Sequence, residues 1–240
     1  MASKIISKKK TNKKPLAAIQ QLPKDLLIEV VASIASQSFH DVHNMKICCR
    51  DFLKITEEDY VLQKICLDSF PLIQWFPNEK ALSFLKRCMK SGNVEILFRE
   101  GFRECFSYSN ENNFGGLDKL KTAAQKGHKE AIYMYGMILL CSENLDSRNQ
   151  GLEYMRFLRK SKNIVSSRNK VHCLSKSFWK NNKMSMRRQT HLCNFKETCK
   201  GWKPKEGRWS FINDDDDDTN LCEFCRWDYE LEFFYQLFNI

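Results

Sequence analysis

The apolar positions after residue 22 recur with the spacing of a short amphipathic helix. Leu22 and Pro23 open the segment, and one helix face is predicted to carry the apolar residues Leu26, Leu27, Val30, Val31 and Ile34. Pro23 suits the first helical turn, because the backbone N–H that proline lacks would have no helical partner there. Asp25 and Glu29 place negative charge near the positive end of the helix. The pattern therefore predicts a helix that begins near residue 23.

Two more short helices are predicted before residue 70. The first is expected after an Asp41 cap and would present the apolar residues Val42, Met45, Cys49 and Phe52. The second follows an acidic stretch at residues 57–59 and would present Val61, Leu62, Ile65 and Cys66. Together the three segments predict a small three-helix module.

This module resembles the F-box, because Leu22-Pro23-x-Asp25-Leu26-Leu27-x-Glu29 matches the opening of the F-box pattern. In that family the module docks on the Skp adaptor of a cullin–RING ubiquitin ligase. The resemblance implies an adaptor-binding set made of Leu22, Pro23, Leu26, Leu27, Val30, Phe39 and Phe52. An ordinary helical hairpin that begins with Leu-Pro is the alternative.

An internal repeat follows the first module. The segment 85–95 is echoed by 120–130, so that Gly92 and Gly127 are 35 residues apart, as are Gly101 and Gly136. A period of about 34–36 residues is typical of tetratricopeptide-like helix–turn–helix repeats. The small side chains at Ala123, Ala124, Ala131 and Gly136 would let paired helices approach closely. The segment 123–136 resembles Sel-like repeats, which are tetratricopeptide relatives, and a chance echo in a plain helical bundle is the alternative.

A third copy of the repeat is expected to begin near Asp146. In this copy Lys162 stands where the two earlier copies have a glycine that would end the first helix. A single repeat cannot bury its own apolar side, so neighbouring repeats must cover it.

Cysteine and tryptophan become frequent near the C-terminus. Cys222 and Cys225 have the spacing of a zinc knuckle, and Cys193 and Cys199 would complete a tetrahedral site, with His191 as a substitute ligand. Four buried or partly exposed thiols in a small apolar lobe are the alternative. A helical stripe follows, at Trp227, Leu231, Phe234 and Phe238, and is expected to pack on the repeats.

The predicted fold class is therefore mainly α, with a three-helix F-box, a short helical repeat array and a small Cys/Trp-containing C-terminal lobe. The expected boundaries are a disordered basic tail at 1–18, the F-box at 19–72, the repeats at 73–180 and the lobe at 181–240, with an acidic loop at 213–219. The lysine cluster at 8–15 indicates either a nuclear-import signal or a solvated tail. Nuclear or cytoplasmic location is expected.

Charge and composition limit the other function classes. The formal charge is +10, but the basic residues do not form a helix face with interleaved aromatics, which disfavours nucleic-acid binding. The sequence contains no run of about 18 apolar residues, so no membrane span is expected. No secretory signal is recognised, so the eleven cysteines read as reduced residues or metal ligands rather than as disulfides.

The sequence contains no recognisable catalytic motif, such as a nucleophile elbow, a paired-histidine zinc motif or a glycine-rich phosphate loop. The F-box resemblance implies a non-catalytic substrate receptor of a Skp–cullin–F-box ubiquitin ligase, which would bind an unknown target protein through the repeats or the tail. Two alternatives remain at this stage. One is a protein-interaction scaffold outside any ligase, and the other is a zinc-dependent nucleic-acid-binding protein.

Overall fold

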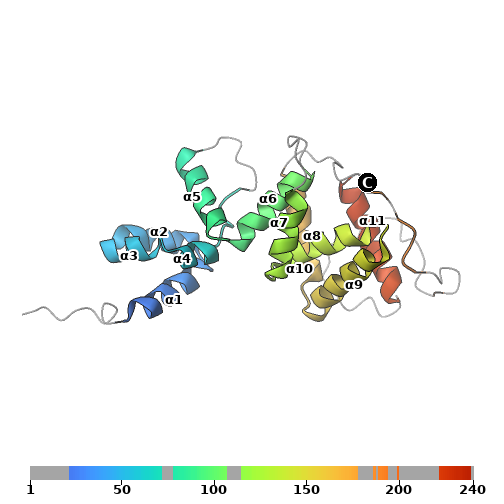
Figure 1. Ribbon diagram of the computed structural model, residues 1–240, viewed down its shortest axis with the longest axis horizontal. Coiled ribbons are helices and arrows are strands. Elements are labelled where there is room, and N and C mark those ends of the chain that lie inside the picture. Colours follow the sequence, from blue (N-terminus) through green and yellow to red (C-terminus); the bar gives the residue numbers. More distant parts are fainter. Residues whose placement is uncertain are drawn as a thin grey trace, which may run out of the picture. The chain divides into compact units, whose positions relative to one another are not determined.

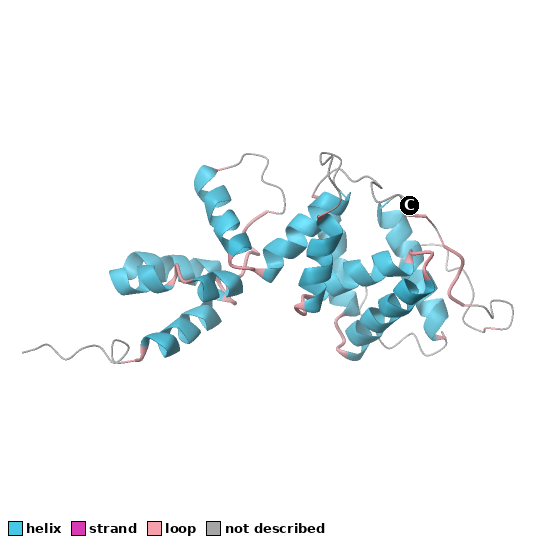
Figure 2. Cartoon of the chain, in the orientation of Figure 1, coloured by secondary structure: helices cyan, strands magenta, loops and turns pink. Residues whose placement is uncertain are grey.

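The computed structural model describes residues 22–71, 78–106, 115–177, 186–187, 189–193, 199 and 222–238. Every regular element within these ranges is a helix, so the mainly α fold class is confirmed (Figure 2). The chain divides into two compact units, residues 1–65 and 66–240. The predicted basic tail at 1–18 and the acidic loop at 213–219 lie outside the described residues.

The first unit contains helices α1 (Lys24–Ala35), α2 (Phe39–Cys48), α3 (Arg50–Ile55) and α4 (Asp59–Lys64) (Figure 1). Its small core is apolar and comprises Val31, Ala32, Ala35, Val42, Ile55, Val61, Leu62 and Ile65. Ion pairs tie the helices together at the surface, for example between Lys24 and Glu58 at 2.8 Å.

Two details of this unit differ from the sequence prediction. The cap of α2 is Ser38, whose hydroxyl accepts a hydrogen bond from the backbone N–H of Asp41 at 3.2 Å. Ser38 is therefore the N-cap, because its side chain accepts the hydrogen bond from a backbone N–H of the first turn. Asp41 lies within that first turn and is not the cap. In addition, the predicted second helix is divided at Cys49, whose extended backbone (φ −157°, ψ 166°) ends α2 and begins α3.

The second unit begins with three helical hairpins. They pair α5 (Glu79–Lys90) with α6 (Val94–Phe106), α7 (Gly116–Gln125) with α8 (Lys129–Leu140), and α9 (Leu145–Lys160) with α10 (Ile164–Ser175). The third hairpin contains Lys162 in its turn, as the repeat period predicted.

The turns of the three hairpins have the same geometry. Gly92, Gly127 and Lys162 all adopt left-handed backbone angles, with φ of 78°, 86° and 54°. The next residue in each turn, Asn93, His128 or Asn163, donates its backbone N–H to a carbonyl five residues earlier, at 3.0, 3.1 and 2.9 Å. This is the Schellman pattern that satisfies the last carbonyls of a helix. The 35-residue period is therefore a repeat of structure as well as of sequence.

Glycines also recur where consecutive hairpins cross. A Cβ atom added to Gly101 would lie 2.8 Å from the carbonyl oxygen of Gly116, and one added to Gly151 would lie 2.9 Å from that of Gly136. The two pairs are again related by a shift of 35 residues. Helices α6 and α7, and α8 and α9, can therefore approach closely only because these positions lack side chains.

The C-terminal helix α11 (Glu223–Phe238) completes the core of this unit. The predicted stripe is buried, with Trp227, Phe234 and Phe238 fully inaccessible and Leu231 nearly so. Phe238 contacts Phe102 and Phe106 of α6, at ring-centroid distances of 5.9 and 4.1 Å. The expectation that the stripe packs on the repeats is therefore confirmed.

A buried charged group joins α11 to two other helices. The carboxylate of Glu230 accepts hydrogen bonds from the Tyr133 hydroxyl of α8 at 2.6 Å and from two guanidinium nitrogens of Arg168 of α10 at 2.8 and 2.7 Å. Glu230 is 1% exposed, so its charge is neutralised by contact rather than by water. Helix α11 thus covers a face built from α6, α8 and α10, the second helices of the three hairpins.

Candidate adaptor-binding face and cysteine cluster

Helix α1 has two apolar faces rather than the single face that the sequence suggested. Val31 and Ala35 are buried in the core of the first unit. Leu26 and Val30 are 53% and 43% exposed, and their spacing of four residues places them along one outward stripe of the helix. Leu22, which precedes the helix, is 41% exposed. The helical period alone did not separate these sets, because Leu26 with Leu27 and Val30 with Val31 are adjacent in the sequence.

The other predicted adaptor residues differ in their exposure. Pro23 is exposed and precedes the first turn, where its carbonyl accepts the backbone N–H of Leu27 at 3.1 Å. Leu27, Phe39 and Phe52 are half-buried, so each is shared between the small core and the surface.

Sequence reasoning missed three other large exposed side chains in this unit. Ile47, Leu53 and Tyr60 are 71%, 40% and 40% exposed. Ile47 and Leu53 do not follow the helical spacing of the buried apolar residues. This difference in spacing could have identified them as outward-facing from the sequence. The Tyr60 hydroxyl donates to Glu29 at 3.2 Å, and this hydrogen bond raises the pKa of Tyr60.

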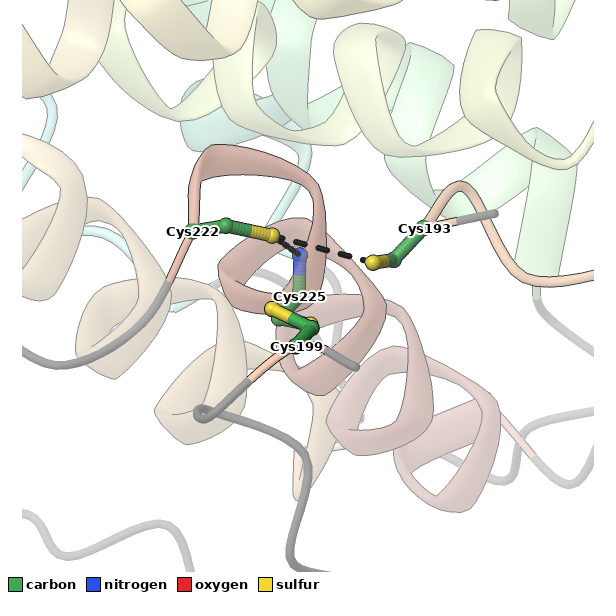
Figure 3. A group of neighbouring side chains, drawn as sticks. All are labelled: Cys193, Cys199, Cys222 and Cys225. Atoms are coloured by element: carbon green, nitrogen blue, oxygen red, sulfur yellow. Dashed lines mark hydrogen bonds between the residues drawn. The ribbon is translucent and has the colours of Figure 1, made fainter. Parts of the chain in front are cut away.

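The four predicted cysteine ligands converge in the second unit, as Figure 3 shows. All four sulfurs lie within 4.8 Å of one another. The Sγ atoms of Cys193 and Cys222 are 3.7 Å apart, and those of Cys199 and Cys225 are 3.5 Å apart (the Cys193–Cys222 contact is dashed in Figure 3). Cys222 immediately precedes α11, and Cys225 is in its first turn. The start of this helix is thus brought to two segments that are distant in the sequence.

The cluster has the dimensions of a four-thiolate metal site. Zinc–sulfur bonds of about 2.3 Å in a tetrahedron separate neighbouring sulfurs by about 3.8 Å, whereas a disulfide requires about 2.05 Å. Desolvation raises the pKa of the Cys222 and Cys225 thiols, so an ion would have to displace their protons. The four cysteines are therefore within metal-binding distance of one another.

Backbone contacts hold the cluster in place. The backbone N–H of Cys225 donates to the Cys222 sulfur at 3.3 Å. The carboxylate of Asp228 accepts the backbone N–H groups of Leu192 at 2.7 Å and Cys193 at 3.1 Å. His191, the predicted substitute ligand, is not part of the four-sulfur group, and its Nδ1 atom lies 3.8 Å from Asp228. Asp228 thus positions the segment that carries Cys193, a role that the sequence did not reveal.

No helix in the described ranges is both long and apolar enough to cross a membrane.

Comparison with known proteins identifies the repeats and finds relatives that are named F-box proteins. Residues 67–176 match the family of plant tetratricopeptide repeats. A putative F-box protein of Arabidopsis thaliana is 32% identical over 184 residues, which is 74% of this chain and 60% of that protein. A second F-box protein of Arabidopsis thaliana is 30% identical over 166 residues, which is 67% of this chain and 98% of that protein.

The coverage differs between these relatives, because the chain spans less than two thirds of the first and almost all of the second. No solved structure gives a significant match. The relatives and the repeats point to an adaptor-type protein. At 30% identity and nearly full coverage of the second relative, the chain belongs to the F-box protein family.

Proposed function

We propose that this protein is a substrate receptor of a Skp–cullin–F-box ubiquitin ligase. Its first unit would bind a Skp-type adaptor, and the repeats or the C-terminal lobe would bind a target protein. The observation that carries the proposal is the exposed apolar surface made by Leu26 and Val30 on one face of α1 and by Leu22 just before the helix, because apolar side chains gain free energy when a partner covers them. In this role the protein brings a target close to the ligase without catalysing a reaction, in the nucleus or the cytoplasm.

Adaptor binding is tested by copurification of a tagged chain with a plant Skp adaptor. Replacing Leu22, Leu26 and Val30 together with alanine should abolish copurification while leaving the helix content unchanged, because these side chains are outside the core. Leu145→Ala is a matched control, since this residue is 69% exposed but belongs to the second unit. Equal adaptor recovery from the triple variant and the wild type would reject the docking face.

The cysteine cluster supports a second proposal, that Cys193, Cys199, Cys222 and Cys225 bind one structural zinc ion. A zinc site would hold the first turn of α11 to residues 193 and 199 and thereby stabilise the cover on the repeats. Sulfur separations of 3.5 and 3.7 Å and the Asp228 contacts to the backbone support this assignment.

Elemental analysis of the purified chain tests this proposal. About one zinc per chain should remain after dialysis, and a strong chelator should remove it and make the C-terminal lobe sensitive to protease. Cys222→Ser should reproduce this loosening without chelator, whereas Cys173→Ser, at an exposed cysteine outside the cluster, should not. A zinc content far below one per chain, with an intact lobe, would identify the four cysteines as core thiols.

We also propose two more specific family features, one in the repeats and one in the C-terminal tail. We expect the repeats to be of the Sel-like type and the Cys-x-x-Cys-Arg-Trp-Asp tail to mark a subgroup of plant F-box receptors.

A further inference from the structure

A groove of about 540 Å³ lies beside the turn between α7 and α8. Ala124 and Gln125 form one wall, Ile132 contributes from α8, and Tyr154 and Phe157 of α9 form the other wall. Phe157 is 55% exposed, although it belongs to the well-packed repeat unit. The groove therefore offers apolar and aromatic surface between two neighbouring hairpins.

The groove remains open, whereas the side formed by the second helices is covered. Helix α11 buries its aromatic stripe against α6, α8 and α10. On α9, by contrast, the inward residues Leu152, Met155 and Leu158 are buried, while Phe157 stays exposed to solvent. This difference separates Phe157 from the aromatic residues that build the core.

The rim of the groove is positively charged. Lys121 is on the same face of α7 as Gln125, one turn earlier, and Lys160 is one turn after Phe157 on α9. Both lysines are exposed, and neither forms an ion pair within the described part of the chain. Lys126, beside Gln125, reaches only the carbonyl oxygen of Gly92, at 3.4 Å.

The one acidic residue that lines the groove is already paired. Glu153 accepts a hydrogen bond from the Arg156 guanidinium at 2.6 Å, and Arg156 also makes two hydrogen bonds to Glu223 at 2.6 and 3.1 Å. The sequence has no aspartate or glutamate from residue 154 to residue 196, and the other acidic group near the lysines is Asp118, exposed one turn before Lys121 on α7. An occupant with negative charge would therefore find unpaired cations around an apolar floor.

We propose that this groove binds an acidic peptide segment that carries an aromatic or long aliphatic side chain. The apolar side chain would contact Phe157, Tyr154 and Ile132, and the flanking carboxylates would face Lys121, Lys126 and Lys160. The identification of this peptide with a ligase target rests on the proposed receptor function, but binding itself does not. The groove thus defines the chemical class of target that the repeats select.

The experiment measures fluorescence anisotropy with a labelled synthetic peptide that contains one phenylalanine and one leucine among aspartates. Phe157→Ala should weaken binding about tenfold, because an aromatic anchor is typically the main contributor to such an interface. Lys121→Glu combined with Lys160→Glu should weaken binding at least about fivefold, and added salt should reduce the wild-type affinity. The substituted residues are exposed, so the variants are expected to fold.

A charge-matched control is available on the same unit. Lys80→Glu combined with Lys176→Glu changes the net charge equally at exposed positions outside the groove, and should leave peptide affinity unchanged. Equal binding to the groove variants and this control would overturn the proposal. Displacement of the peptide by a single-stranded oligonucleotide of equal affinity would overturn it in favour of nucleic acid. Tighter peptide binding when the chain's own Asp214–Asp218 run is replaced by asparagine would support the proposal, because it would show that an acidic segment of the same chain competes for the groove.

Adaptor copurification of the same variants separates the two proposals. The groove variants should still recover the adaptor, because Leu22, Leu26 and Val30 belong to the other unit. Peptide binding by a wild-type chain that fails to recover the adaptor would reject the ligase role alone. Adaptor recovery with no detectable peptide binding would reject the groove alone.

Discussion

The two compact units differ in how many large apolar side chains they expose to solvent. Six of the ten large exposed apolar side chains of the described chain lie in residues 22–65, namely Leu22, Leu26, Val30, Ile47, Leu53 and Tyr60. The second unit is more than twice as long, yet its described residues expose only Leu82, Leu145, Phe157 and Phe224, because its own helix α11 covers the second helices of the repeats. The first unit leaves apolar surface exposed to solvent, whereas the second covers most of its own apolar surface.

This contrast predicts where substitutions affect stability and where they affect binding. In the second unit, contacts between distant segments should dominate the free energy of unfolding. In the first unit, the outward residues of α1 should contribute little to folding and much to association. The following changes test that distinction, from the largest expected effect on stability to the smallest.

Glu230→Ala should destabilise the second unit by about 3–5 kcal/mol. The change leaves Arg168 buried without its bidentate partner, and an uncompensated buried charge is strongly unfavourable. The unfolding temperature of the variant should be far below that of Gln236→Ala, a change at an exposed position on the same helix. Similar unfolding temperatures for the two variants would mean that α11 does not cover the repeats in solution.

Acid should weaken the second unit through Glu95. Burial acts to raise the pKa of this carboxyl, but the hydrogen bond from His128 and the charge of Arg99 outweigh it and hold the pKa at about 2. A pKa below the unfolded value stabilises the fold above about pH 4.5, and this stability is lost as the pH falls toward 2. The contribution is on the order of 3 kcal/mol.

Denaturant titrations across this pH range measure the contribution. Glu95→Gln should flatten the acid limb of the stability profile, whereas Asp118→Asn, at an exposed carboxyl on α7, should leave it steep. Parallel acid limbs for wild type and Glu95→Gln would show that another group controls the loss.

Gly136→Leu should destabilise the crossing of α8 and α9 by about 1–3 kcal/mol. A Cβ atom added at this position would lie 3.2 Å from both Met155 Sδ and Tyr154 Cβ, so a longer side chain must displace the neighbouring helix. The melting temperature should fall clearly below that of Gly115→Ala, where the nearest contact is the end of the Glu104 side chain. An unchanged melt would contradict the close crossing.

Lys162→Gly should stabilise the third hairpin by about 0.5–1 kcal/mol. Lysine is strained at φ 54°, and glycine relieves this strain but loses more backbone entropy on folding. Lys160→Gly, at the last residue of α9, should have the opposite sign because glycine weakens a helix. Denaturant unfolding of both variants gives the two signs, and equal signs would show that the turn is not left-handed.

Leu26→Ser should change the free energy of unfolding by less than about 0.5 kcal/mol while it reduces adaptor binding. Leu26 is more than half exposed and is not part of the core of the first unit. Chemical denaturation and adaptor titration of the same sample provide both values. A large stability loss would indicate that the stripe belongs to the core and not to an interface.

The sequence predicted the repeat architecture well because its signals are local. Gly92, Gly127 and Lys162 mark turns whose hydrogen bonds lie within six residues, so a 35-residue period could be read directly. The matching period of Gly116 and Gly151 was available in the sequence but was overlooked. Only the structure shows that each opposes another glycine across a helix crossing.

Other features depend on contacts between distant residues and could not be read from a pattern. Glu230 meets Tyr133 across 97 positions of sequence, and nothing near Glu230 identifies its partner. The convergence of the four cysteines was predicted from the knuckle spacing of Cys222 and Cys225, but the role of Asp228 was not. The two faces of α1 could not be separated because both carry leucine and valine in adjacent positions.

The position of α11 in the chain has a consequence for biosynthesis. All six repeat helices leave the ribosome before α11 does, so Phe102, Phe106 and Tyr133 emerge without the helix that covers them. The repeat unit therefore cannot complete its core during most of its own synthesis, and the nascent chain exposes an aromatic surface that invites chaperones or aggregation. A premature stop before residue 223 would make that transient state permanent, although residues 22–65, which belong to the other compact unit, would be unchanged.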